Sequence, residues 1–211
     1  MKQVANLSVL PFIAHGFYNA TDSKTVKDPV LMNQVHSADA WFLTTAPTTP
    51  PSVDALITQT PNLTLTVKTA DCAPILLADP TSRMIAAIHA GWRGAFQGII
   101  EATVLEMMRH GANLSTLSAG IGPHIQKASF EAGENMKALF PSTEYRFFTE
   151  QNGGWLFDFD AYVMHRLHRA GVQSIVSVGD DTYPDPAYFS YRRNPEDKGR
   201  QFSSITILEG P

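Results

Sequence analysis

Two short apolar segments joined by a four-residue turn limit most strongly how this chain can fold. They occupy residues 73–78 (APILLA) and 84–88 (MIAAI), and the turn between them is DPTS, residues 79–82. Apolar runs of this length between turn formers are typical of buried strands. Proline presets φ in such a turn, and an aspartate can accept hydrogen bonds from the backbone that follows it. We therefore predict two neighbouring antiparallel strands.

Residues with reactive side chains lie at the ends of these two segments. Cys72, the only cysteine, precedes the first strand, and His89 follows the apolar part of the second. An antiparallel pair would bring both residues to the same end of the sheet. Gly91 and Gly94 lie on either side of Arg93, and glycine lets the backbone approach a ligand closely. The free N–H groups of a helix start, together with the Arg93 guanidinium, would form an anion site; the alternative for Arg93 is a surface ion pair.

The remaining chain combines strand and helix patterns. An amphipathic helix is expected at 95–110, where apolar residues recur with a period near 3.6 and Gly111 follows as a C-cap. One or two strands are expected in residues 1–20 and a loop at 21–28. Without repeats or linkers, the pattern predicts one α/β domain over residues 1–211, with mixed strands. Further strands are predicted at 40–44, 54–58, 63–69, 117–121, 172–178 and 202–208, and further helices at 130–140 and 159–170.

Composition excludes several classes of protein. The net charge is −4 and no block of lysine or arginine occurs, so nucleic-acid binding is not expected. No apolar run reaches the ~20 residues that span a bilayer, so membrane insertion is not expected either. A single cysteine cannot form an intrachain disulfide, and the N-terminal segment is a poor signal peptide. These features predict a cytoplasmic protein.

A third residue completes a candidate metal site. His36, in the segment NQVHS, forms a Cys/His/His set with Cys72 and His89. Three protein ligands and an open fourth position are the pattern of catalytic zinc, although no local C-x-x-C or H-x-x-x-H spacing supports it. The same residues allow a nucleophilic pair in which His89 acts as base for Cys72, or a Cys72 that is merely a small buried residue. His124 is a further candidate, whereas peripheral positions are expected for His15, His110, His165 and His168.

Several motifs taken together resemble the YfiH or laccase-domain family. They are NQVHS, DALIT, TADCAPILLAD, AAIHAGWRG, GIGPHI followed by Phe130-Glu131, and FSYRR with GRQ, in this order over residues 34–207. The resemblance implies an α/β domain with mixed sheet layers flanked by helices, related to the cysteine-hydrolase fold. It also implies Zn²⁺ held by His36, Cys72 and His89, and phosphorolysis of adenosine, inosine or guanosine to the base and ribose 1-phosphate. Adenosine deamination and methylthioadenosine cleavage are associated activities, and a homodimer is a further expectation.

Residue roles follow from this interpretation. Arg93 and the neighbouring glycine N–H groups would hold phosphate against the ribose C1′, and Arg192 and Arg193 are further anion-binding candidates. Tyr191 would stack on or hydrogen-bond the nucleoside, unless it is a core tyrosine. The amides of residues 33 and 34 would read a base or ribose edge, or else bond within their loop. We therefore expect catalytic roles for Cys72, His89 and Arg93, and substrate contacts from Gln34, Arg93, Tyr191 and Arg192.

The chain departs from the family pattern in two places. Ala20 stands near the place of a family arginine, and residues 15–34 are too short to hold the rest of the family's N-terminal segment. A family cysteine is replaced by the acidic pair Asp180-Asp181. The shortened segment leaves open a binding module without catalysis. Two further enzyme classes also stay open, a Cys-His amidase that edits peptidoglycan precursors and a copper polyphenol oxidase. Copper ranks behind zinc, because one cysteine and seven scattered histidines supply few ligands for several copper ions.

Overall fold

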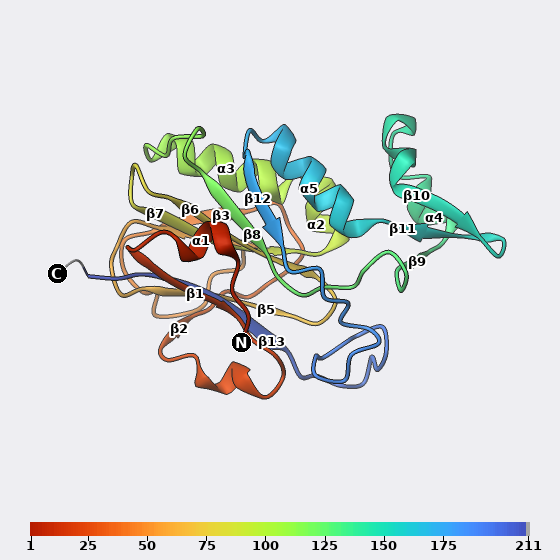
Figure 1. Cartoon of the computed structure of the whole chain (residues 1–211), viewed down its shortest axis with the longest axis horizontal. Helices are drawn as coiled ribbons and strands as arrows, with labels where there is room; N and C mark the ends of the chain where they lie inside the picture. The colour runs from red at the N-terminus through yellow and green to blue at the C-terminus, as the bar shows by residue number, and fades with distance from the viewer. Residues whose placement is uncertain (210–211) are drawn as a thin grey trace.

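Three β-sheets form the framework of the protein, and the computed structural model describes residues 1–209 (Figure 1). The largest sheet has, in spatial order, β12 (Ser174–Ser177), β8 (Ser118–Ile121), β6 (Ala73–Asp79), β7 (Met84–Ala90), β4 (Ala55–Thr58) and β3 (Ala40–Leu43). It is mixed, because β12 runs parallel to β8 and β3 to β4, whereas the strands between them pair antiparallel. The second sheet has β1 (Ile13–Phe17), β13 (Gln201–Ile207), β5 (Thr64–Thr69) and β2 (Pro29–Val30). The third has β10 (Phe148–Gln151), β11 (Gly154–Phe157) and β9 (Glu131–Ala132).

The largest sheet lies between a helical layer and the second sheet (Figure 1). The helices of that layer are α2 (Trp92–Gln97), α3 (Ile99–Arg109) and α5 (Phe159–Arg169). Alternate residues of β6 enter different cores: Ile75 and Leu77 pack toward the helices, whereas Leu76 and Ala78 pack toward the second sheet. Each fully buried leucine or isoleucine contributes about 1.5–3 kcal/mol. Burial on both faces explains why β6 and β7 read as continuous apolar runs. The described residues thus form the single mixed α/β domain that was predicted; the last two residues of the predicted range lie outside them.

The predicted pair of antiparallel strands is confirmed. In β6 and β7, Ala73 lies opposite Ala90 and Pro74 opposite His89. The carboxylate of Asp79 accepts hydrogen bonds from the backbone N–H groups of residues 81 and 82, both at 3.1 Å, as the turn chemistry predicts. Cys72, directly before β6, therefore meets His89 at one end of the sheet.

The predicted helix at 95–110 is wrong in its start and its continuity. The helix begins at Trp92, and Gly98 interrupts it with φ of +102° before α3 begins. A left-handed conformation of this kind favours glycine. The earlier start matters for function, because Arg93 then lies inside the first turn of α2 instead of before it.

The predicted helix at 130–140 is also wrong. Its residues form β9, the four-residue helix α4 (Glu134–Lys137) and a turn. Phe130 and Phe140 both pack against Phe157, with ring centroids 5.3 and 5.4 Å apart. These aromatic contacts with distant residues replace the local helical ones, and the segment with β9, α4, β10 and β11 projects from one end of the domain (Figure 1).

Smaller differences concern the ends of the chain. Residues 1–20 contain the short helix α1 (Ala5–Ser8) and one strand, β1. The loop expected at 21–28 contains a 3₁₀ helix, η1 (Asp22–Thr25), and a second one, η2 (Ser142–Phe147), precedes β10. The strand expected at 172–178 is reduced to β12. Within residues 1–209, no helix combines the length and apolar character needed to cross a bilayer.

Candidate active site with a metal-ligand cluster

Three side chains from separate parts of the chain converge at the end of β6 and β7. Donor atoms of His36, Cys72 and His89 all lie within 4.8 Å of one another. His36 comes from the loop between β2 and β3, Cys72 from the connection of β5 to β6, and His89 from β7 itself. The two imidazole rings meet edge to face, with centroids 4.8 Å apart. The structure therefore assembles the trio that was picked out from the sequence.

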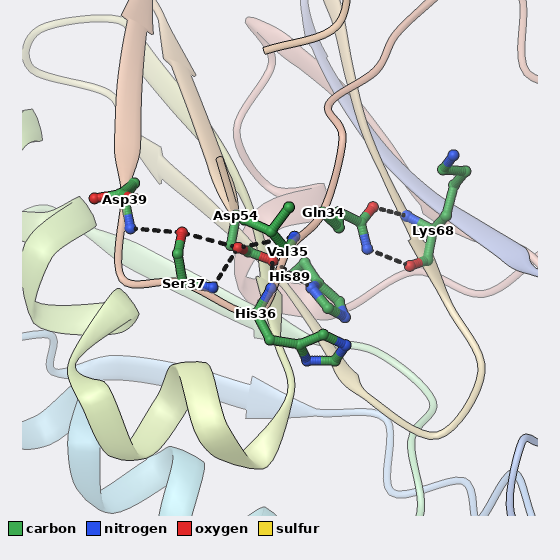
Figure 2. A network of polar contacts seen from close by, with 8 residues as sticks. All are labelled: Gln34, Val35, His36, Ser37, Asp39, Asp54, Lys68 and His89. Carbon is green, nitrogen blue, oxygen red and sulfur yellow. Dashed lines mark hydrogen bonds and ion pairs between the residues drawn. The ribbon is translucent and has the colours of Figure 1, made fainter. Parts of the chain in front are cut away.

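A buried carboxylate holds the His36 loop. Asp54 is fully buried and accepts backbone N–H bonds from Val35 (3.2 Å), His36 (3.1 Å) and Ser37 (2.6 Å), together with the Ser37 hydroxyl at 3.0 Å (Figure 2). His36 has φ of +60°, which is uncommon for a residue with a side chain. The bonds to Asp54 stabilise this conformation and fix the direction in which the imidazole leaves the backbone.

The same carboxylate orients His89. Oδ1 of Asp54 lies 2.7 Å from Nδ1 of His89, and the Asp54 carbonyl accepts the His89 backbone N–H at 2.8 Å. Burial would lower the pKa of His89, but its interactions with Cys72 and with the Asp54 carboxylate outweigh burial and raise that pKa to about 9. Burial would likewise raise the pKa of Asp54, yet hydrogen bonds from His89 and Ser37 lower it, so the carboxylate stays ionised. Because Nδ1 of His89 bonds Asp54, the other ring nitrogen, Nε2, is the one available to the cluster.

Asp54 was not singled out from the sequence. The signal was present in the DALIT motif, where an ionisable residue directly precedes a strand that is otherwise buried and almost entirely apolar. Buried carboxylates are rare unless they are paired, so such a position deserves a functional hypothesis.

Another aspartate fixes the turn that carries Cys72. Asp71 has φ of +79°, and its carboxylate accepts bonds from the Thr182 hydroxyl (2.7 Å), the Ser190 hydroxyl (3.1 Å) and the Arg192 backbone N–H (2.7 Å). Residues far apart in sequence thereby lock the backbone on the N-terminal side of the cysteine. Cys72 itself is half-buried and therefore accessible from one side.

The glycines after His89 make room for the His36 loop. A Cβ atom on Gly91 would lie 2.4 Å from Nδ1 of His36 and 3.3 Å from Sγ of Cys72. A Cβ atom on Gly94 would lie 3.0 Å from the carbonyl oxygen of Ser37. The sequence suggested that these glycines let the backbone approach a bound ligand, and in the structure they let it approach the loop that carries His36.

A cavity of about 780 Å³ opens beside the cluster. This volume is within the range of small-molecule sites. Aromatic side chains form part of its wall, namely Trp92, Phe130, Phe159 and Tyr191. Five cationic side chains line it as well, namely Lys68, Arg93, Arg192, Lys198 and Arg200.

Arg93, Tyr191 and Arg192 all line this cavity. The Arg93 guanidinium lies over the Trp92 ring, 4.5 Å from its centroid, and the ion pairs among residues 1–209 include none to Arg93. Tyr191 is 56% exposed, so it is not a core tyrosine. Arg192 donates from Nη2 to the Glu131 carbonyl at 3.0 Å, which leaves part of its guanidinium for a ligand.

Other candidates have structural partners. Gln34 lines the cavity, but its amide donates to the Lys68 carbonyl (2.7 Å) and accepts from the Lys68 N–H (2.9 Å), as Figure 2 shows. The expectation that Arg193 binds an anion is wrong, because its guanidinium donates to backbone carbonyls, including that of Thr182 at 2.9 Å. His124 is fully buried and its Nδ1 lies 2.8 Å from the Gly122 carbonyl, outside the cluster.

The donor set fits a metal ion. Neighbouring ligand atoms around a tetrahedral ion such as zinc lie roughly 3.5 Å apart, so small side-chain rotations bring the three donors to one ion. A thiolate with two imidazoles suits zinc or copper. In such sites the second ring nitrogen of a histidine ligand usually bonds a carboxylate or carbonyl group, and Nδ1 of His89 bonds Asp54 in this way.

The fold and this centre define a class: a mixed α/β domain whose cavity holds an open His/Cys/His cluster. The chain belongs to the family described as multi-copper polyphenol oxidoreductase laccase, whose model matches residues 17–208. A Rickettsia prowazekii protein named purine nucleoside phosphorylase is 36% identical over 172 residues, which are 79% of this chain and 71% of that protein. The Escherichia coli purine nucleoside phosphorylase YfiH is 33% identical over 184 residues, 85% of this chain and 74% of that protein.

Solved structures agree with this membership. A Neisseria meningitidis protein has a TM-score of 0.80 at 28% identity, over 90% of this chain and 78% of that chain. YlmD from Geobacillus stearothermophilus has a TM-score of 0.78, also at 28% identity, over 86% of this chain and 74% of that chain. The resemblance drawn from the sequence motifs is confirmed.

Proposed function

We propose that this protein is a zinc-dependent purine nucleoside phosphorylase that converts adenosine, inosine or guanosine and phosphate to the free base and ribose 1-phosphate. The observation that carries the proposal is the His/Cys/His cluster beside a cavity with both aromatic and cationic walls. The names of the relatives in Rickettsia prowazekii and Escherichia coli support the same reaction.

In this proposal His36, Cys72 and His89 hold the zinc ion, and Asp54 orients two of them. A bound zinc ion supplies Lewis-acid chemistry at the site. The same chemistry suits deamination of adenosine, and the phosphorolysis extends to methylthioadenosine. Asp54 holds two of the three donors, because its carboxylate binds both the His36 loop and the His89 ring.

The side chains of the cavity have the chemistry that phosphorolysis requires. A phosphate oxygen forms a bond to C1′ of the ribose while the bond from C1′ to the purine nitrogen breaks, and its electron pair and a proton end on the base. Arg93 can hold the phosphate dianion, since it faces the cavity without a carboxylate partner among residues 1–209. The exposed Tyr191 ring and the Trp92 ring offer surfaces on which a purine can stack.

One observation favours a second candidate, a Cys-His amidase. Cys72, His89 and Asp54 lie in the order thiol, imidazole, carboxylate, which is the arrangement of an activated nucleophile. In that reaction the Cys72 sulfur would bond the amide carbonyl carbon, His89 would protonate the departing amine, and water would release the acid. A bound metal would occupy the thiolate and block this route.

The test combines metal analysis with a product assay. Protein purified without added metal should carry one zinc per chain, and breakdown of adenosine or inosine should require phosphate and yield ribose 1-phosphate. Removal of zinc by a chelator should stop the reaction, and zinc should restore it. Zinc retained in full by the Cys72→Ala, His36→Ala and His89→Ala variants would contradict the ligand assignment. Amidase activity gained by the apoprotein, with no nucleoside turnover by the zinc form, would favour the second candidate.

A further inference from the structure

The cationic side chains of the cavity come from two different parts of the fold. Arg93 belongs to α2, directly after the strand that carries His89. Lys68 belongs to β5 of the second sheet, and Arg200 directly precedes β13, which pairs antiparallel with β5 so that Lys68 lies opposite Phe202 and Thr69 opposite Gln201. The cationic wall of the cavity therefore combines residues from two parts of the fold.

The pairing of β5 with β13 brings Lys68 and Arg200 to the same end of the second sheet. Successive residues of a strand point to opposite faces, and residues opposite each other point to the same face. Thr69 and Gln201 lie opposite each other and are both buried, at 1% exposure. Lys68 precedes Thr69 within β5 and therefore takes the opposite face, Arg200 directly precedes β13, and both side chains line the cavity. Lys198, two residues before Arg200, lines it too.

These cations have no carboxylate partner in the described part of the chain. Nζ of Lys198 donates to the Pro195 carbonyl at 3.2 Å, and Nη1 of Arg200 donates to the Gly199 carbonyl at 2.6 Å. The single carboxylate of the cavity wall belongs to Asp71, whose oxygens already accept three hydrogen bonds from residues of the 182–192 segment. The cavity wall therefore carries five cations and a carboxylate whose oxygens are already hydrogen-bonded, although the whole chain has a net charge of −4. A wall of this composition attracts anions.

The Lys68 side chain is directed away from the metal-ligand cluster. Figure 2 shows it pointing away from His36 and His89, and two hydrogen bonds between Gln34 and the Lys68 backbone hold this part of the strand. A phosphate held by Arg93 near the cluster would thus leave Lys68 and Arg200 without an anion. A substrate that extends across the cavity and ends in its own phosphate would engage both groups.

We propose that Lys68 and Arg200, assisted by Lys198, bind a phosphate carried by the substrate, so that the preferred substrates are nucleoside 5′-monophosphates. The inference deepens the proposed function and rests on it for the reaction, which remains transfer of the ribosyl C1′ from base to inorganic phosphate. The product of a purine nucleoside 5′-monophosphate would be the base and ribose 1,5-bisphosphate.

The experiment compares adenosine with its 5′-monophosphate on the zinc-loaded protein at fixed inorganic phosphate. We expect kcat/KM for the monophosphate to exceed that for adenosine by about ten- to a hundredfold, the effect of one or two charge-assisted contacts. The ratio of the two values should fall at least tenfold in Lys68→Gln and in Arg200→Gln. Lys24→Gln, an exposed lysine that does not line the cavity, is the matched control and should leave the ratio unchanged.

Calorimetric binding separates failure of the inference from failure of the proposed function. Tighter binding of the monophosphate that depends on Lys68 and Arg200, without cleavage, would uphold the subsite and reject the phosphorylase. Phosphorolysis of adenosine with no preference for the monophosphate would reject the subsite alone. A rise in the KM for inorganic phosphate in Lys68→Gln as large as in Arg93→Gln would assign these cations to the co-substrate and overturn the inference.

Discussion

Gly91 and His36 pack so closely that a side chain at position 91 cannot be accommodated without moving the imidazole. The nearest approach of an added Cβ atom would be 2.4 Å, to Nδ1 of His36, well below the separations that Cβ atoms show in proteins. Gly91 itself has φ of −72° and ψ of 159°, a conformation open to any residue. The demand for glycine here is therefore steric, and the contact that creates it is a candidate metal ligand.

Gly91→Ala should weaken metal binding while the fold persists. The added methyl group displaces His36 from the cluster, and loss of one of three ligands should lower zinc affinity at least tenfold. Competitive titration of zinc against a chromogenic chelator measures this change. Gly133→Ala is the matched control, because a Cβ atom there meets nothing within 4 Å and φ is −80°. Equal zinc affinity in the two variants would contradict the steric role.

Asp54→Asn should damage both the His36 loop and the orientation of His89. The amide nitrogen would face hydrogen-bond donors, so we expect a loss of about 1–3 kcal/mol in the free energy of unfolding. Zinc affinity should fall about ten- to a hundredfold, as for other residues that support metal ligands. Denaturant unfolding of the apoprotein and zinc titration measure the two effects. Ser37→Ala, which removes the hydroxyl bond to Asp54 at 3.0 Å and the bond that this hydroxyl accepts from the Asp39 N–H at 3.1 Å, should give a smaller loss in both.

Arg93→Ala should raise the KM for phosphate about ten- to a hundredfold, the effect of losing one charge-assisted pair of about 1.5–3 kcal/mol. The fold should persist, because the side chain is exposed and its one aromatic contact is with the adjacent Trp92. Steady-state kinetics with varied phosphate measure the change, and circular dichroism checks the fold. Arg109→Ala, on the exposed side of α3, should leave this KM as it is. An unchanged KM for phosphate in Arg93→Ala would contradict the proposal that Arg93 binds this anion.

His15 should make the protein less stable in mild acid. Its Nε2 accepts the Val4 N–H at 3.1 Å, and burial lowers its pKa from the ordinary 6.5. Below pH 6.5 the unfolded chain therefore binds a proton that the folded chain does not, and this contribution to stability falls as the pH falls toward the folded-state pKa. Above pH 6.5 it is fully present. Free energies of unfolding of the apoprotein between pH 5 and 8 should show a flatter profile for His15→Gln, whereas the exposed His168→Gln should follow the wild-type slope.

The features that the sequence predicts well are those formed by neighbouring residues. The β6 and β7 hairpin follows from two apolar runs and one turn, and it alone brings Cys72 to His89. The predicted helix at 130–140 fails because Phe130 and Phe140 find partners at Phe157, beyond the reach of a local pattern.

The candidate site divides in the same way. The ligand trio was recognised by residue type and by motif, but the role of Asp54 depends on contacts with the His36 loop and with His89. Neither partner adjoins it in the chain. Likewise, the Gln34 amide bonds the backbone of β5, a strand that begins thirty residues later in the chain. The NQVHS motif alone therefore could not predict this structural role.

The Asp54 contacts also bear on how the centre obtains its metal. The Asp54 carboxylate binds both the His36 loop and the His89 ring through hydrogen bonds of the protein itself, so folding positions two of the three candidate ligands. Copper outcompetes zinc for most nitrogen and sulfur sites when both are free. The metal found in a given preparation should then depend on the growth medium as well as on the sequence, and protein from a copper-rich culture should carry copper.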